Sequence, residues 1–365
     1  MMLPLIVALL ISFMICLALY GSSKFLIGLV RRHDLSAVQS MHTKPTLRLA
    51  GVAIFMSIFL TNTIFTDGHD LLSILLLCSI PLLTLGLLED LGVHQPPSRR
   101  LISSVVAGAI FIAVTGTYLQ YPGTLLLNWV FEYWLIAVFF TLFITSGIVN
   151  AFNLIDGLNG LSGSVSLVAA TGIAAVSYNA GISHIALPAA VICGAVIGFM
   201  LLNFPFGRIF LGDAGAYGIG FILSWMSLDV LMEAPEVSPW AMLMMFFWPF
   251  ADTTLTMSRR LMSGLPLGQP DRLHFHQVVM RIIEISFLGR GGRRYSNPLA
   301  TIVVLPLMSL PPLLGVLFAD NNFMSAMLFC LFIVLFAALY NVLIRLAPRL
   351  RRKRTYIRFV QGYPT

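Results

Sequence analysis

Five acidic side chains interrupt a very apolar chain at points where charge is costly. Each stands at the edge of a long hydrophobic run, and the five are Glu89, Asp90, Asp156, Asp213 and Asp252. A carboxylate beside hydrocarbon is unfavourable unless a cation, a proton or a hydrogen-bond donor relieves it, so a role in chemistry is the default interpretation. Two adjacent carboxylates, Glu89 and Asp90, favour a shared proton or a divalent cation, with a pair of solvated interfacial charges as the alternative.

Amide and carboxylate side chains recur in the segment 150–163. If this segment is helical, the three-residue spacing of Asn150, Asn153 and Asp156 keeps them near one face. The glycines that follow allow the backbone to break and to approach a ligand closely. Oxygen ligands of this kind suit Mg²⁺, and they also suit ribose or phosphate groups. An Asn/Gly-rich turn between two spans is the alternative.

Two further segments carry groups suited to a cation or a phosphate. Asp213 lies in Phe-Leu-Gly-Asp-Ala-Gly-Ala directly before an apolar run, and the alternative is that it only caps the helix that begins there. Arg208, five residues earlier, either meets a phosphate or anchors the loop. A later polar segment combines basic and acidic residues at Asp271, Arg272, His274 and His276. Capture of an anion by Arg and His fits that segment better than zinc, because thiolates are absent.

The rest of the chain must position these groups within a membrane. Of 365 residues, 58% are hydrophobic and 10% charged, and the mean hydropathy is +0.91, which excludes an ordinary soluble domain. An all-α polytopic protein is expected, because only helices satisfy their own backbone in lipid. Runs of about 20 apolar residues predict about eleven spans. They are 3–22, 47–66, 71–88, 101–119, 130–148, 161–178, 183–203, 215–232, 238–256, 299–319 and 323–344.

Charge predicts the orientation of these spans. With eleven spans, all 22 Lys and Arg residues fall on one face, which the positive-inside rule makes cytoplasmic. The N-terminus is then outside and the C-terminus inside. We expect one membrane domain, 1–345, followed by a basic cytoplasmic tail, 346–365, that meets anionic lipid and no nucleic acid. Carboxylates for a cation and basic groups for anions, all at a membrane surface, suit phosphoryl transfer between a soluble nucleotide and a lipid.

These motifs resemble, in order, those of the polyprenyl-phosphate N-acetylhexosamine-1-phosphate transferases, glycosyltransferase family 4. The Asp-Arg-x-His-x-His form at 271–276 is closest to the branch that transfers GlcNAc 1-phosphate to undecaprenyl phosphate. The matching segments are 42–51, 89–90, 150–163, 210–215, Asp252, 259–260 and 270–276.

The resemblance implies a reaction at the bacterial inner membrane, on its cytoplasmic side. Undecaprenyl phosphate attacks the β-phosphorus of a UDP-sugar and UMP leaves, as the first membrane step of O-antigen, lipopolysaccharide or a related surface glycan. It implies Mg²⁺ or Mn²⁺ held by Asp213, Asp156 and Asp90, with Asp90 and Glu89 orienting or deprotonating the lipid phosphate. A homodimer is compatible with it. Substrate contacts are expected from Lys44, Arg48, Asn150, Asn153, Asn159, Arg208, Asp271, Arg272, His274 and His276.

The chain departs from the family pattern at several positions. Glu89 replaces an Asp, Asn159 stands where a second Asp is common, and Gln277 where a further His is common. Two other functions compete with the transferase: a transporter or flippase for the same lipid carriers, and a catalytically weak scaffold of the same family. Transport favours ionisable groups near the middle of the membrane, whereas here the acids gather at one face.

Overall fold

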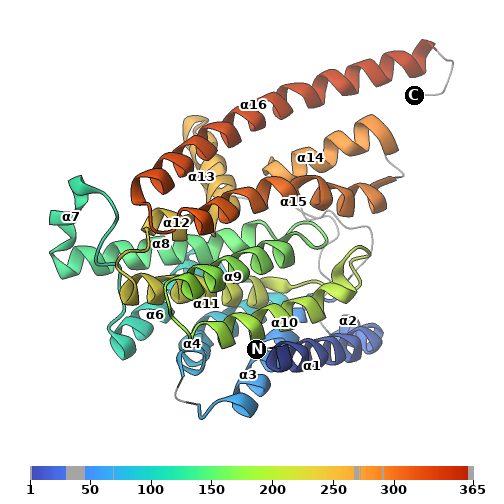
Figure 1. Ribbon diagram of the computed structural model, residues 1–365. Coiled ribbons are helices and arrows are strands. Elements are labelled where there is room, and N and C mark those ends of the chain that lie inside the picture. The colour runs from blue at the N-terminus through green and yellow to red at the C-terminus, as the bar shows by residue number, and fades with distance from the viewer. Residues whose placement is uncertain are drawn as a thin grey trace.

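The protein is helical throughout the part of the chain that the structure describes. This computed structural model describes residues 2–29, 46–68, 70–266, 271, 273–289 and 292–360, and its helices are drawn in Figure 1. They are α1 (Met2–Gly21), α2 (Ser23–Leu29), α3 (Ala50–Phe65), α4 (Leu71–Cys78), α5 (Ile80–Asp90), α6 (Pro97–Thr115), α7 (Leu125–Phe131), α8 (Trp134–Leu154), α9 (Leu161–Asn179), α10 (Ala186–Asn203), α11 (Gly212–Glu233), α12 (Pro239–Met244), α13 (Phe247–Met262), α14 (Phe275–Ile283), the π-helical turn η1 (Glu284–Leu288), α15 (Arg293–Leu317) and α16 (Asn322–Val360).

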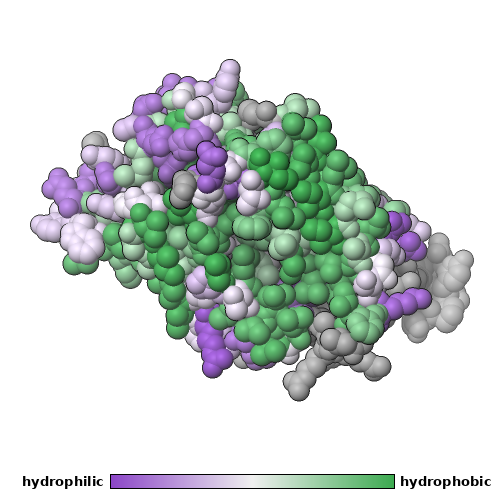
Figure 2. Space-filling model, turned by 90° about the horizontal axis from the view of Figure 1, so that it is seen from below, coloured by the Kyte–Doolittle hydropathy of each residue, from purple (hydrophilic) through white to green (hydrophobic). Residues whose placement is uncertain are grey.

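Several of these helices can cross a membrane. Eight are long and apolar enough, and α4 with α5 forms a ninth span if the two, bent by 49°, are taken together. The eight are α1, α6, α8, α9, α10, α11, α15 and α16. Figure 2 shows hydrophobic surface across the middle of one face, with hydrophilic side chains toward its ends. The predicted all-α, multi-pass architecture is therefore confirmed.

The predicted number of about eleven spans is not reached among the described residues. The run 47–66 yields only the 16-residue helix α3, because the chain before it is extended and pairs with another segment. Phe210 donates its backbone N–H to the Leu47 carbonyl (2.9 Å), and Gly51 donates to the Leu211 carbonyl (2.8 Å). The run 238–256 is broken between α12 and α13. Pro249, the third residue of α13, has no N–H to donate to the carbonyl of Met245, so a helix running through this point would lack that hydrogen bond.

Helix α11 lies at the centre of the bundle and positions the candidate site at its first turn. It packs against α3, α5, α8 and α9, and 18 of its 22 residues are buried. Small residues allow this close packing. A Cβ on Gly51 of α3 would collide with the Gly215 backbone, and one on Gly86 of α5 would lie 2.5 Å from the Ala214 nitrogen. Backbone therefore touches backbone where α3 and α5 cross α11, within two residues of Asp213.

We expect Gly86→Ala to lower the thermal midpoint and the activity together. The added methyl would force α5 away from α11, and overpacking of this kind costs about 1–3 kcal/mol. The matched control is Gly147→Ala in α8, where an added Cβ meets nothing within 4 Å. Thermal unfolding in detergent checks the prediction, and equal midpoints for the two variants would contradict it.

Candidate active site

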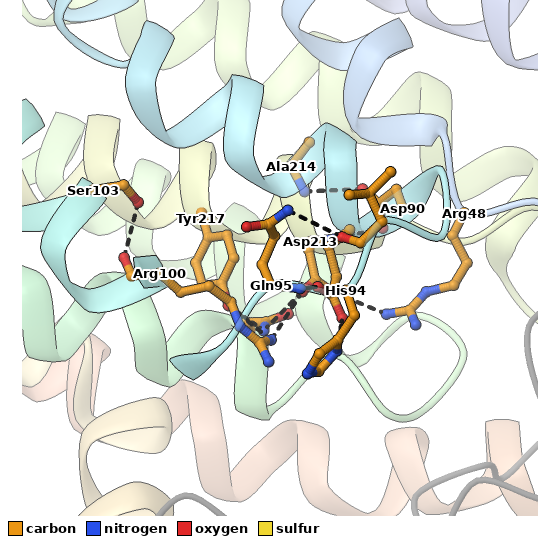
Figure 3. Close-up of polar contacts among 12 residues, drawn as sticks. Arg48, Asp90, His94, Gln95, Arg100, Ser103, Asp213, Ala214 and Tyr217 are labelled. Carbon is orange, nitrogen blue, oxygen red and sulfur yellow. Dashed lines mark hydrogen bonds and ion pairs between the residues drawn. The ribbon is translucent and has the colours of Figure 1, made fainter. Parts of the chain in front are cut away.

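Asp213 is held between two arginines at the start of α11. Its carboxylate is 3.2 Å from Arg48 Nη2 and 3.2 Å from Arg100 Nη1, and its side chain is 6% exposed. Arg48 comes from the extended segment before α3, and Arg100 from the first turn of α6. Figure 3 shows the two guanidinium groups on opposite sides of Asp213. The charges of Asp90 and Asp156 also act on Arg48, so carboxylates and guanidinium groups meet at this point, and the two guanidinium groups are the ones suited to bind an anion.

Asp90 supports Asp213 through the backbone of α11. Its carboxylate accepts the N–H of Asp213 (2.8 Å) and the N–H of Ala214 (3.0 Å), so it caps α11 from the neighbouring helix (Figure 3). A negative charge at this end is favourable to the helix dipole. The interpretation of Asp213 as the helix cap is wrong, because the cap position is Leu211 and the Asp213 side chain turns to the arginines.

The close approach at Gly212 makes this arrangement possible. Its φ is +78°, and a Cβ there would lie 2.6 Å from Asp90 Oδ2 and would collide with the Arg48 carbonyl. Only glycine provides both the left-handed backbone and the space. Asp90, Asp213 and the Arg48 segment are thus locked around one residue.

Asn153 and Tyr217 complete the immediate surroundings of Asp213. Asn153 Nδ2 donates to the Tyr217 hydroxyl at 2.7 Å and lies 3.5 Å from Asp213 Oδ2. Arg100 Nη1 is 3.4 Å from the same hydroxyl. The sequence interpretation missed Arg100, which was counted only toward membrane orientation, and Tyr217. The four-residue spacing of Asp213 and Tyr217 on one helix face was a signal for the latter.

Asp156 lies in the turn between α8 and α9. Helix α8 ends at Leu154, so the helical register of Asn150 and Asn153 stops before Asp156. Asp156 accepts a hydrogen bond from the Ser162 hydroxyl at 2.6 Å. Burial raises the pKa of Asp156, although the Ser162 bond and the charge of Arg48 oppose the shift, and the charge of Asp213 adds to it. Asp156, Arg48 and Asp213 therefore act on one another electrostatically.

Glu89, Asn150 and Arg208 make their own contacts with groups other than Asp213. The Glu89 carboxylate accepts the backbone N–H of Gln95 and lies 3.6 Å from His94 Nδ1, so it organises the turn after α5. Asn150 Nδ2 donates to the Ser146 carbonyl of its own helix (2.8 Å). The Arg208 guanidinium lies over the Phe206 ring, 5.4 Å from its centre.

Asn159 is a buried connection to α15. Its backbone N–H donates to Asn297 Oδ1 (2.8 Å), its carbonyl accepts from Thr301 Oγ1 (2.8 Å), and its Nδ2 donates to the Pro205 carbonyl (2.8 Å). These contacts hold the turn that carries Asp156 against the helix behind it. An amide suits this position better than a carboxylate would, because Nδ2 is used as a donor.

A second polar group surrounds Asp252 of α13. Its carboxylate lies 2.9 Å from His274 Nδ1 and 3.6 Å from His276 Nδ1, and it accepts the backbone N–H of Phe275 at 2.8 Å. The Asp252 and His274 side chains are 1% and 3% exposed. Asp252 thus orients the His274 ring and caps α14 through the Phe275 N–H, much as Asp90 caps α11.

The two histidines differ in their preferred charge. Burial alone would lower the pKa of His274, but the Asp252 carboxylate outweighs it and raises that pKa. Burial lowers the pKa of His276, which makes no side-chain hydrogen bond through either ring nitrogen. His276 Nε2 would lie 3.1 Å from a Cβ on Gly157, so this ring packs against the turn that carries Asp156. Of the two rings, His274 is therefore the one that holds a proton more readily.

Asp271 organises the arginines that precede it. Its carboxylate pairs with Arg259 and lies 3.4 Å from Arg260 Nη1, and it accepts the Leu273 N–H at 2.9 Å. Burial would raise the pKa of Asp271, but Arg259 and the Leu273 bond lower it. Lys44 and Arg272, both expected to bind phosphate, lie outside the described residues.

The carboxylates suit a Mg²⁺ ion that substrate phosphates complete. Asp90 uses both oxygens as backbone acceptors, which leaves Asp213 and Asp156 as the better donors. Among the described residues, Asp90, Asp156 and Asp213 do not bring three ligand atoms within 4.8 Å of one another. Protein sites for Mg²⁺ commonly supply only one or two carboxylates and take phosphate oxygens from the substrate. The donor set fits that pattern better than a preformed three-carboxylate cage.

The fold and site together define a multi-pass membrane protein with a buried carboxylate–arginine centre at one end of its central helix. The family described as "Glycosyl transferase family 4" matches residues 71–231, a range that contains Asp90, Asp156 and Asp213. Over this range the chain matches a family of transferases, in agreement with the resemblance of its motifs.

Curated relatives extend the similarity beyond that range. A probable undecaprenyl-phosphate N-acetylglucosaminyl 1-phosphate transferase of Bacillus subtilis is 28% identical over 283 residues, 76% of this chain and 78% of the relative. An undecaprenyl-phosphate alpha-N-acetylglucosaminyl 1-phosphate transferase of Escherichia coli O157:H7 is 28% identical over 309 residues, 83% of this chain and 81% of the relative. The protein of the same description from Salmonella typhi is 27% identical over 260 residues, 70% of each chain.

Proposed function

We propose that the protein transfers an N-acetylhexosamine 1-phosphate from a UDP-sugar to undecaprenyl phosphate and releases UMP. The observation that carries the proposal is the buried Asp213 between Arg48 and Arg100, supported from behind by Asp90. The site thus brings together a carboxylate that could bind a metal ion and two guanidinium groups that could bind phosphates. The relatives named for this reaction on undecaprenyl phosphate support the choice of substrates.

The chemistry is a single displacement at phosphorus. An oxygen of the lipid phosphate forms a bond to the β-phosphorus, the bond from that phosphorus to the oxygen bridging to the α-phosphorus breaks, and UMP leaves with the bridging oxygen. The lipid phosphate is already largely ionised near neutral pH, because its second pKa is about 6. Asp90 is therefore not needed as a strong base. Its cap contacts support a role in holding Asp213 in place.

The protein contributes orientation and charge. Arg48 and Arg100 can turn from Asp213 to the phosphates, because guanidinium groups bind phosphate and carboxylate oxygens in the same geometry. Asp213 and Asp156 would hold Mg²⁺, which neutralises charge on the diphosphate when bound. His274, whose pKa is raised by Asp252, would add positive charge when protonated, and the contact of its neighbour His276 with Gly157 places it near the turn of Asp156. We assign Lys44 and Arg272 to the phosphates as well.

The membrane orientation belongs to the same proposal. We infer that the end of the bundle with Asp213 faces the cytoplasm of a bacterium, because Arg48 and Arg100 lie at that end and basic residues gather on the cytoplasmic side of a membrane protein. The N-terminus is then outside and the C-terminus inside if α3 and the pair α12 and α13 each cross the membrane in addition to the other spans. The donor would be UDP-GlcNAc or a 6-deoxy relative, and the product would start O-antigen or a related surface glycan.

The test is UMP release by purified protein in detergent. We expect UMP only when undecaprenyl phosphate, Mg²⁺ and one UDP-N-acetylhexosamine from a panel are all present. Release without the lipid would contradict the transfer reaction. If no UDP-sugar of the panel gives UMP release, and the protein is shown to be folded by its cooperative thermal unfolding, the result would favour the scaffold alternative.

The Asp252–His274 pair predicts a pH dependence. Asp252→Asn keeps an acceptor for the Phe275 N–H but removes the charge that raises the His274 pKa, so that burial then brings this pKa below its ordinary 6.5. If imidazolium at His274 assists transfer, activity is lost as pH rises through its pKa. The alkaline limb of the pH–activity profile should therefore move to lower pH, by about one unit or more.

Thr256→Val is the matched control for this experiment. Thr256 Oγ1 is 3.4 Å from the same ring nitrogen of His274 but carries no charge. Its replacement should leave the alkaline limb where it is in the unmodified protein. An unmoved limb in Asp252→Asn, with activity retained, would rule out a charged His274 in the reaction.

A further inference from the structure

Three metal-ligating side chains gather at the end of α11 opposite Asp213. Asp229 and Glu233 lie in the last two turns of α11, and His184 lies in the turn between α9 and α10. A helix of 22 residues is about 33 Å long, so this group is far from the candidate active site. Nothing in the proposed transfer reaction uses these residues.

The geometry of the three side chains is close to that of a metal centre. His184 Nε2 is 2.8 Å from Asp229 Oδ2 and 3.5 Å from Glu233 Oε1. One ligand atom from each residue lies within 4.8 Å of the other two. Ligand atoms around a tetrahedral Zn²⁺ stand about 3.3 Å apart. The three groups therefore need only small adjustments to bind one ion together.

The electrostatic environment calls for a cation. Asp229 and Glu233 are four residues apart on one helix, a spacing at which like charges repel. They also stand at the helix C-terminus, where the dipole disfavours negative charge. The last turn of α11 has no basic residue, and within the described ranges only His184 forms an ion pair with either carboxylate. A cation bound between the two carboxylates removes both penalties.

The backbone holds His184 in place before any ion binds. Helix α9 ends in a left-handed Gly181 (φ +76°), whose N–H donates to the Tyr178 carbonyl at 3.1 Å. The Ile182 N–H reaches back to the Ser177 carbonyl at 2.8 Å, and Ala186 donates to the Ser183 carbonyl as α10 begins. The turn that carries His184 is thus ordered on both sides. The side chains of His184 and Glu233 are 41% and 50% exposed, which leaves room for water as a further ligand.

We propose that His184, Asp229 and Glu233 bind a divalent transition-metal ion of the zinc class. Imidazole nitrogen favours Zn²⁺ over Mg²⁺ or Ca²⁺, which prefer oxygen ligands alone. Three protein ligands with an open position leave an ion that is exchangeable and exposed to water. The ion would tie the turn between α9 and α10 to the end of the central helix and so stabilise the bundle from the side opposite the active site.

Calorimetric titration of Zn²⁺ into the full-length, tag-free protein tests this site. After chelator treatment in detergent, the unmodified protein should bind one equivalent with micromolar affinity, and its thermal midpoint should rise. His184→Ala, and separately Asp229→Asn combined with Glu233→Gln, should weaken that binding by at least about 10-fold and abolish the rise. UMP release in Mg²⁺ should be unchanged in both.

Glu236→Gln is the control, because Glu236 is an exposed acid just beyond α11 and outside the group. It should bind Zn²⁺ like the unmodified protein. Binding that persists in His184→Ala would place the ion elsewhere and overturn the proposal. So would the absence of saturable binding to the unmodified protein, which would leave a protonated His184 as the only cation between the carboxylates.

Discussion

Asp213→Asn should lower the rate of UMP release by about 100- to 1000-fold, the loss typical of removing one preorganised electrostatic group. The amide has the shape of the carboxylate, and the backbone contact with Asp90 does not involve the side chain, so the fold should persist. What disappears is the charge that pairs with Arg48 and Arg100 and that would bind Mg²⁺. Steady-state kinetics with varied Mg²⁺ measures the effect.

The control for this variant is Asp67→Asn. Asp67 is an exposed carboxylate before α4, and its replacement removes the same charge from the molecule without touching the site. It should retain normal turnover. If Asp213→Asn kept normal turnover and normal Mg²⁺ dependence, Asp213 would not be a metal ligand, and the proposed mechanism would lose its central residue.

Asp90→Ala should be among the most destabilising single replacements in this chain. Asp90 is 3% exposed, and its loss leaves the N–H groups of Asp213 and Ala214 buried without an acceptor. Each such group costs about 1–3 kcal/mol, so we expect a decrease of about 2–4 kcal/mol in the free energy of unfolding. The thermal midpoint, followed by tryptophan fluorescence, reports this loss.

Comparison with two other replacements identifies the cause. Asp90→Asn keeps one acceptor and should fall between Asp90→Ala and the unmodified protein. Glu89→Ala, next in the chain, loses only the contacts with the turn at Gln95 and His94 and should be less destabilised. Equal stability of Asp90→Ala and Glu89→Ala would show that the cap on α11 contributes little to the free energy of unfolding.

The length and spacing of apolar runs predicted most of the helices, because a helix in lipid must be long and apolar whatever its neighbours are. The two runs that failed were altered by contacts with distant parts of the chain or by a proline. Residues 47–49 are not helical, and the backbone at their start and just after them bonds to Phe210 and Leu211, through Leu47 and through Ala50 and Gly51. The apolar pattern of residues 47–66 gives no indication of this contact with a distant part of the chain.

The candidate site was predictable in its carboxylates and less so in its geometry. Asp90, Asp156 and Asp213 stand out in sequence because charge is rare in this chain. The different partners of Glu89 and Asp90, the turn at Gln95 for one and the start of α11 for the other, cannot be inferred from two adjacent residues in the sequence. Arg100 joins Asp213 across 113 residues of sequence, and only the packing of α6 and α11 through their neighbours brings the two together.

Helices α3 and α5 cross α11 at Gly51 and Gly86, and this close contact also limits how these helices can move relative to one another. With backbone against backbone at Gly51 and Gly86, these helices cannot slide past Asp213 without a collision. Helix α14 packs on α15 and α16 rather than on this crossing, and it carries His276 against the turn of Asp156. The α3–α5–α11 crossing thus gives Asp213 a rigid base, whereas the position of His276 depends on the packing of α14 against α15 and α16.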